Sequence, residues 1–143
     1  SAEQRFEEAI SHYKIAIKIK PDSADVHYNL GNALVADGKN EEAIDSFKET
    51  IRIQPDFADA YNNLGAVLFN KGKNKEAISH YKMAVKINPD SAGTYNNLGV
   101  VLFGEGKNEE AIDSFKEAIR IRPNFAAAQK NLETVLLQSA AHE

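Results

Sequence analysis

Residues 58–91, ADAYNNLGAVLFNKGKNKEAISHYKMAVKINPDS, carry a pattern that returns through the whole chain. Proline, glycine, leucine and alanine each recur at intervals of 34 residues. A fixed period of this size is typical of proteins built from stacked repeats. The recurring positions are Pro21, Pro55, Pro89 and Pro123; Gly31, Gly65 and Gly99; Leu30, Leu64, Leu98 and Leu132; Ala9, Ala43, Ala77 and Ala111.

Each period predicts two helices. Residues 58–70 place apolar side chains at helical spacing, and Lys71-Gly72-Lys73 interrupts them. A second apolar stripe then runs to Pro89, which cannot continue a helix. We expect Asn74 to be the N-cap of this second helix, because its side chain can accept a hydrogen bond from a free backbone N–H of the first turn.

A longer period is also visible. Residues 10–31 match residues 78–99 at 15 of 22 positions, but match residues 44–65 at only 11. The sequence therefore indicates a duplicated unit of two repeats.

Composition is that of a soluble globular protein: 143 residues, 43% apolar and 27% charged. Without cysteine the chain has no disulfide, zinc-thiolate site or thiol nucleophile. No apolar run is long enough to cross a bilayer and no signal segment opens the chain, so we expect a cytoplasmic location. The net charge of −4 argues against nucleic-acid binding.

Each period resembles the tetratricopeptide repeat (TPR) family in the order of its recurring residues. That order is an aromatic residue, Leu-Gly, a large residue, Ala, an aromatic residue, Ala and Pro. The resemblance covers nearly the whole chain and implies an all-α fold, a right-handed superhelix of antiparallel helix pairs. One departure is Thr50, which stands where the family has alanine. The matching residues of the middle repeat are Tyr61, Leu64, Gly65, Leu68, Ala77, Tyr81, Ala84 and Pro89.

Residues 1–143 are thus expected to form one array, with seven helices in all. A half-repeat, a second helix only, is predicted over residues 4–20. Full repeats are predicted over 24–57, 58–91 and 92–125, and a capping helix over 126–138. Glu133 occupies the recurring glycine position, which favours a cap.

The two ends of the predicted array lack a neighbouring helix. We expect helix 4–20 to expose Ile10 and Tyr13, and these residues, with Leu136 at the other end, are candidates for self-association into a homo-oligomer. Glu133 argues against direct docking of one end on the other, because it would crowd Ala9. The alternative is that the chain is a fragment of a longer array.

The family resemblance implies that the first helices line a concave face. Asparagine dominates the corresponding positions and recurs every 34 residues as a ladder, Asn29, Asn63, Asn97 and Asn131. An asparagine amide is both donor and acceptor, which complements a peptide group. The candidate peptide-binding residues are Tyr28, Asn29, Asn32, Asn62, Asn63, Phe69, Asn96, Asn97, Phe103 and Asn131.

The motif Tyr-Asn-Asn-Leu-Gly at 61–65 and 95–99 is similar to the repeats in the TPR portion of the O-linked N-acetylglucosamine transferase. That resemblance implies that the asparagines clamp the backbone of a protein ligand. We therefore expect a scaffold or adaptor. The alternatives are a self-associating structural module and an accessory substrate-binding segment of a larger enzyme such as a glycosyltransferase.

Other functions are not expected. The inward positions lack the lysine and arginine that the family's carboxylate clamp for chaperone tails requires. Ser, His and Asp side chains on the second helices are predicted to be solvated and too far apart for a catalytic triad, so we expect no enzyme. The dispersed histidines predict neither metal nor cofactor. Helix-dipole complementarity explains the basic residues of the second helices, so we expect no nucleic-acid or membrane partner.

Overall fold

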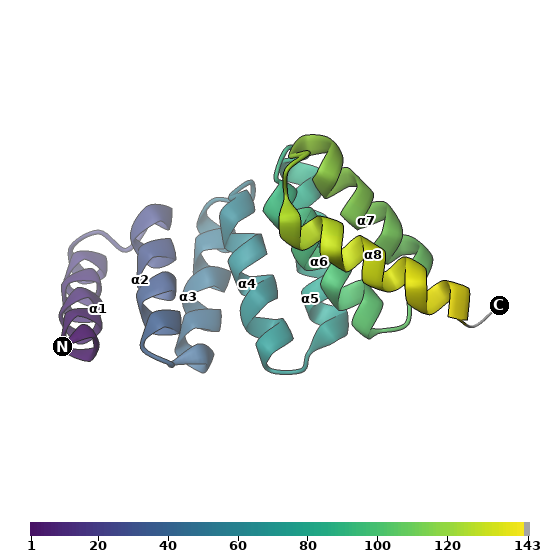
Figure 1. Cartoon of the computed structure of the whole chain (residues 1–143). Helices are drawn as coiled ribbons and strands as arrows, with labels where there is room; N and C mark the ends of the chain where they lie inside the picture. Colours follow the sequence, from purple (N-terminus) through teal and green to yellow (C-terminus); the bar gives the residue numbers. More distant parts are fainter. Residues whose placement is uncertain (142–143) are drawn as a thin grey trace.

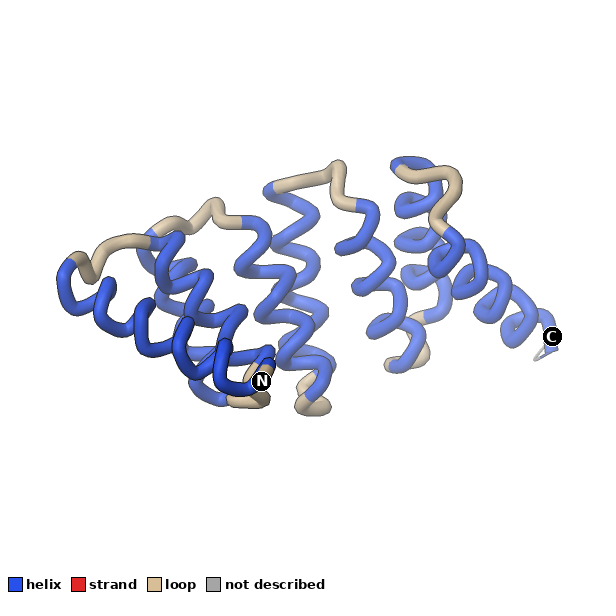
Figure 2. Tube along the Cα trace, turned by 60° about the vertical axis from the view of Figure 1, so that its left-hand side comes forward, coloured by secondary structure: helices blue, strands red, loops and turns tan. Residues whose placement is uncertain are grey.

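The computed structural model describes residues 1–141. They form α-helices joined by short loops, without a strand in this range (Figure 2). The helices follow one another in space in the order of the chain (Figure 1). They are α1 (Ala2–Ile19), α2 (Ala24–Ala36), α3 (Asn40–Ile53), α4 (Ala58–Asn70), α5 (Asn74–Ile87), α6 (Ala92–Gly104), α7 (Asn108–Ile121) and α8 (Ala126–Ala141).

The predicted count of seven helices is wrong, because residues 1–141 form eight. Three full repeats contribute two helices each, and each flanking segment adds one. Helix α1 also starts earlier than predicted, since Ser1 and Gln4 form a capping box at its N-terminus. None of the eight is long and apolar enough to span a membrane.

The prediction that Asn74 is an N-cap is also wrong. Helix α5 already begins at Asn74, Lys73 precedes it, and no side chain caps the helix. The connection is instead fixed by the end of α4. Gly72 adopts a left-handed φ of 78°, and the N–H of Lys73 donates to the carbonyl of Leu68 at 2.9 Å. Glycine suits this turn because it has no Cβ to oppose a positive φ.

Within each repeat, an aromatic ring of the second helix lies on the glycine of the first. A Cβ placed on Gly65 would stand 2.9 Å from Cε1 of Tyr81, and one on Gly99 would stand 2.5 Å from Cε1 of Phe115. These rings belong to a buried cluster that runs from Ile10 in α1 to Val135 in α8. Each repeat therefore buries its apolar face against its neighbours, as expected of a solenoid.

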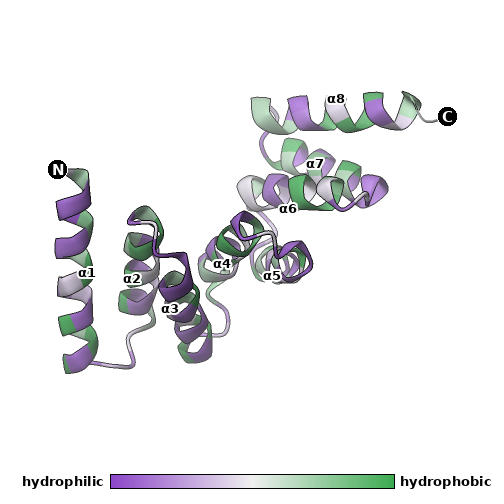
Figure 3. Cartoon of the chain, turned by 90° about the horizontal axis from the view of Figure 1, so that it is seen from below, coloured by the Kyte–Doolittle hydropathy of each residue, from purple (hydrophilic) through white to green (hydrophobic). Residues whose placement is uncertain are grey.

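The array curves toward its first helices. Cα atoms of α2 and α4, of α4 and α6, and of α6 and α8 approach within 8 Å, whereas no such approach joins successive second helices in residues 1–141. The helix axes turn progressively from α1 to α8 (Figure 3). The first helices α2, α4, α6 and α8 thus line the inner face, and α1, α3, α5 and α7 form the outer face.

Candidate functional site

Three of the four ladder asparagines bind the preceding first helix. Asn63 donates from Nδ2 to the Tyr28 hydroxyl at 3.0 Å, Asn97 donates to Oδ1 of Asn62 at 3.2 Å, and Asn131 donates to Oδ1 of Asn96 at 3.0 Å. Each bond joins residues 35 positions apart. The ladder is therefore a series of bridges between successive first helices.

The bridge at Asn63 is reinforced by its neighbours. Asn63 also donates to Oδ1 of Asn32 at 2.8 Å, and it accepts a bond from Nδ2 of Asn62 at 3.2 Å. Tyr28 is held in turn by Phe57, with ring centroids 4.7 Å apart. All of these asparagines are half-buried.

The bridges leave a defined set of free acceptors. Within residues 1–141 the side-chain oxygens of Asn97 and Asn131 receive no hydrogen bond from the protein. Because Nδ2 of each residue is fixed by its bridge, the direction of Oδ1 is fixed as well. The inner face consequently presents ordered carbonyl oxygens that can accept from a ligand N–H.

Asn29 differs from the rest of the ladder. It is exposed and makes no hydrogen bond with another side chain in the described range. Within residues 1–141, α2 is the first of the inner helices, and Asn29 makes no bridge to another inner helix there. The ladder therefore contains two environments that the sequence does not distinguish.

An apolar row runs beside the amides. Phe69 and Phe103 are half-buried and pack against the core, while their equivalents at the two ends, Val35 and Leu137, are exposed. All four recur at 34-residue intervals near the C-terminal ends of the inner helices. The inner face thus combines a row of amides with a parallel row of apolar side chains.

The residues predicted to be exposed at the ends behave differently from one another. Ile10 is only 4% exposed because it packs into the core cluster, and Tyr13 is half-buried against the same cluster. The prediction of an apolar patch at these two positions is wrong. The exposed apolar residues of α1 are Ile15 and Ile19. Leu136 is exposed as expected, at 46%.

The serine, histidine and aspartate residues of the second helices differ in burial. Asp45 and His12 are exposed, but Ser46 and Ser114 are buried, contrary to the expectation that all these positions are solvated. Among residues 1–141 no three histidine, cysteine or acidic side chains are grouped to hold a metal ion.

The titratable groups with shifted pKa values lie outside the inner groove. A hydrogen bond from Arg52 lowers the pKa of Glu49, and one from Arg120 lowers that of Glu117. Burial raises the pKa of Tyr81 to about 12. These shifts follow from surface pairing and core packing, and none of them concerns an inner-face asparagine.

Comparisons with solved structures show the same fold. The crystal structure of MamA superposes with a TM-score of 0.90 at 27% identity, covering 94% of this chain and 79% of that one. YrrB, described as a TPR protein with an unusual peptide-binding site, gives 0.84 at 26% identity over 98% and 72% of the two chains. The first TPR of Spaghetti (RPAP3), bound to the HSP90 peptide SRMEEVD, gives 0.80 at 26% identity over 82% and 93%.

Family models give the assignment. A search of the curated proteins found no significant match. A model described as TPR repeat matches residues 2–38 and 31–72, and one described as tetratricopeptide repeat matches residues 56–124. The finer resemblance to the transferase repeats stays a prediction. With the helical solenoid and these matches, the chain belongs to the tetratricopeptide repeat family.

Proposed function

We propose that this chain is a protein-interaction module that binds an extended segment of a partner protein in its concave groove. The observation that carries the proposal is the pair of ordered oxygens on Asn97 and Asn131, each fixed by a bridge to the preceding inner helix. A fixed acceptor loses little conformational freedom on binding, so more of its hydrogen-bond energy appears as affinity. The module would act by binding alone, without catalysis.

The dimensions of the groove favour an extended ligand. Packed helices lie about 8–10 Å apart. An extended chain advances about 3.3 Å per residue, so about three ligand residues span one repeat. Ligand N–H groups would donate to Asn97 and Asn131, while apolar ligand side chains contact Phe69 and Phe103. The backbone contacts would supply affinity and the apolar contacts selectivity.

Two structural neighbours support this assignment. The Spaghetti domain holds a peptide, and YrrB is described as having a peptide-binding site. Both share the helical array of this chain. A scaffold or adaptor is the simplest role, and the resemblance to transferase repeats makes an accessory segment of a larger enzyme the related alternative.

A selection from a random peptide library tests the proposal. Peptides that bind the wild-type chain are then measured against Asn97→Ala/Asn131→Ala, with circular dichroism to establish that the variant is folded. The matched control is Lys48→Ala/Lys116→Ala, which changes two equivalent positions on the outer helices α3 and α7. We expect loss of binding in the asparagine variant only. Equal loss in both variants, or in neither, would refute the groove as the site.

Self-association is the second candidate, and one observation favours it. A cavity of about 360 Å³ opens between α7 and α8, lined mainly by apolar residues including Ile119, Leu132 and Leu136. If this surface joins two copies, sedimentation velocity will show a mass that rises with concentration and that Leu136→Lys returns to the monomer value. A constant monomer mass in the wild-type chain excludes it.

A further inference from the structure

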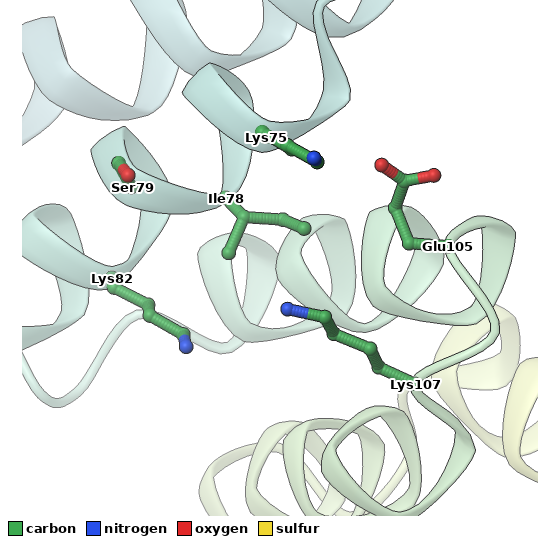
Figure 4. Close-up of a pocket in the computed structure, with 6 residues that line it drawn as sticks. All are labelled: Lys75, Ile78, Ser79, Lys82, Glu105 and Lys107. Carbon is green, nitrogen blue, oxygen red and sulfur yellow. The ribbon is translucent and has the colours of Figure 1, made fainter.

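One groove on the outer face differs in charge from the equivalent positions of the other repeats. A cavity of about 510 Å³ lies between α5 and the turn from α6 to α7. Its lining residues are shown in Figure 4: Lys75, Ile78, Ser79, Lys82, Glu105 and Lys107. Three ammonium groups thus line a cavity that contains one carboxylate, in a chain whose net charge is −4.

The three lysines surround an apolar floor. Figure 4 shows Lys75, Lys82 and Lys107 on three sides of Ile78, which is itself buried. Within residues 1–141, Lys75 and Lys107 have no ion-pair partner within 4.0 Å. Lys82 has a long contact of 3.9 Å with Glu110. Most of the positive charge in this cavity is therefore not neutralised by the protein.

The equivalent positions beside α1 have a different charge balance. There, Glu7 stands at the position of Lys75, and Asp37 pairs with Lys39 at 3.4 Å. Ile10, Ser11 and Lys14 match the remaining positions. The substitution of Glu7 for the lysine at position 75 thus accounts for the difference in formal charge between these positions and the groove beside α5.

The equivalent positions beside α3 carry a smaller excess of positive charge. Three lysines, Lys48, Lys71 and Lys73, stand there with two acidic residues, a formal net charge of +1 against +2 beside α5. Glu41 stands at the position of Lys75 and forms an ion pair with Lys71, and Asp45 replaces the serine. An acidic residue therefore occupies the Lys75 position in both of these repeats. The excess of positive charge is therefore largest beside α5, where a lysine replaces the glutamate of the two preceding repeats.

We propose that the groove beside α5 binds the phosphate group of a phosphorylated serine or threonine in a partner protein. At neutral pH this group carries a charge of about −1.5 to −2 and has three acceptor oxygens, which complements a cavity lined by three lysines. The Ser79 hydroxyl adds a further donor, and Ile78 offers apolar contact to the adjoining ligand chain.

The size of the depression favours a phosphate carried on a protein segment. A second cavity of about 290 Å³ shares Lys75 and Glu105 with the first, so the depression continues past the N-terminus of α5. A free phosphate ion would occupy only a small part of this space. This outer site is separate from the inner groove and does not depend on the function proposed for it.

Titration of the isotope-labelled chain tests the site. The probes are a five-residue glycine peptide with a central phosphoserine, its unphosphorylated form, and inorganic phosphate, all at constant ionic strength. We expect saturable shifts of the amide signals of Ile78, Ser79 and Lys107 with the phosphopeptide, none with the unphosphorylated peptide, and weaker binding of inorganic phosphate.

Charge variants locate the binding. Lys75→Glu introduces the residue found at positions 7 and 41, so the fold should tolerate it. Because it replaces an attractive charge by a repulsive one, it should weaken phosphopeptide binding at least about tenfold, or about 1.4 kcal/mol. Lys48→Glu makes the same charge change at the equivalent positions beside α3 and should leave binding unchanged. Glu7→Lys should create a second site, seen as new shifts at Ile10 and Ser11.

Three results would overturn the proposal. If sodium chloride at matched ionic strength produced the same amide shifts, they would result from screening of the lysine charges and not from binding at a phosphate site. Equal weakening by Lys75→Glu and Lys48→Glu would show attraction by overall charge alone. Binding of inorganic phosphate as tight as that of the phosphopeptide would assign the site to a free anion and not to a phosphoprotein.

Discussion

The helical glycines of this chain fall into two groups that look alike in sequence. Gly99 faces the ring of Phe115, and a Cβ there would stand 2.5 Å from Cε1. Gly104, in the same helix, has no heavy atom within 4 Å of such a Cβ. One glycine is thus required by packing and the other is not.

Alanine at these two positions should have opposite effects on stability. Gly99→Ala forces the Phe115 ring to move and should lower the free energy of unfolding by roughly 1–3 kcal/mol. Gly104→Ala restricts the unfolded chain without a clash and should raise it by about 0.4–1 kcal/mol. Urea denaturation of both variants measures this. If Gly99→Ala were neutral, the ring would not be confined as described.

The buried phenol of Tyr81 predicts a loss of stability at alkaline pH. Its pKa is raised to about 12 by burial, against about 10 in an unfolded chain. Between these values the unfolded chain loses the proton and the folded chain keeps it, so the free energy of unfolding falls as pH rises. Phe47 and Phe115 occupy the equivalent positions, so Tyr81→Phe should fold normally and lose less stability from pH 10 to pH 12. Identical pH profiles for the two proteins would contradict this.

At the scale of helices, the repeat explains what the sequence could predict. Because the pattern occurs in three repeats, the sequence predicts the limits of the helix at residues 58–70. Pro89 likewise predicts where α5 ends. Asn74 is not an N-cap because the preceding turn, which contains Gly72 at a positive φ, fixes the start of α5 one residue earlier. A helix start that is capped by a side chain and one that is fixed by the preceding turn can have similar sequences.

The burial of Ile10 and the bridges of Asn63 were not predictable from the sequence alone. The sequence shows that the first helix lacks one neighbour, but it does not show that Ile10 lies on the side that faces the core cluster. The asparagine bridges join residues 35 apart, so they depend on how two repeats are offset in space. A sequence shows which residues recur together, but not which of them meet.

The bridges predict a stability difference within the ladder. Asn63 donates two hydrogen bonds to the preceding inner helix, α2, and Asn29 donates none to another side chain in the described residues. Asn63→Ala should therefore lower the free energy of unfolding by about 1 kcal/mol, whereas Asn29→Ala should change it by less than about 0.5 kcal/mol. Chemical denaturation distinguishes them. Equal effects would show that the bridges do not hold the stack together.

For the whole molecule, curvature gives its two faces different properties. The inner helices approach closely enough for their amides to bond, so the inner face is continuous along the array. The outer helices do not approach one another in this way within residues 1–141, and the cavity beside α5 lies between them. A continuous surface suits an extended ligand, while a separated groove suits a single charged group.

The most direct measurement follows the side-chain amide signals of Asn97 and Asn131 in the isotope-labelled chain. A peptide selected on the wild-type chain is added stepwise, and backbone amide shifts are recorded at the same time. The proposed function predicts saturable shifts of both side chains and of α4, α6 and α8, with α3, α5 and α7 unchanged. Shifts confined to the outer helices, with both side-chain signals unmoved, would contradict binding in the concave groove.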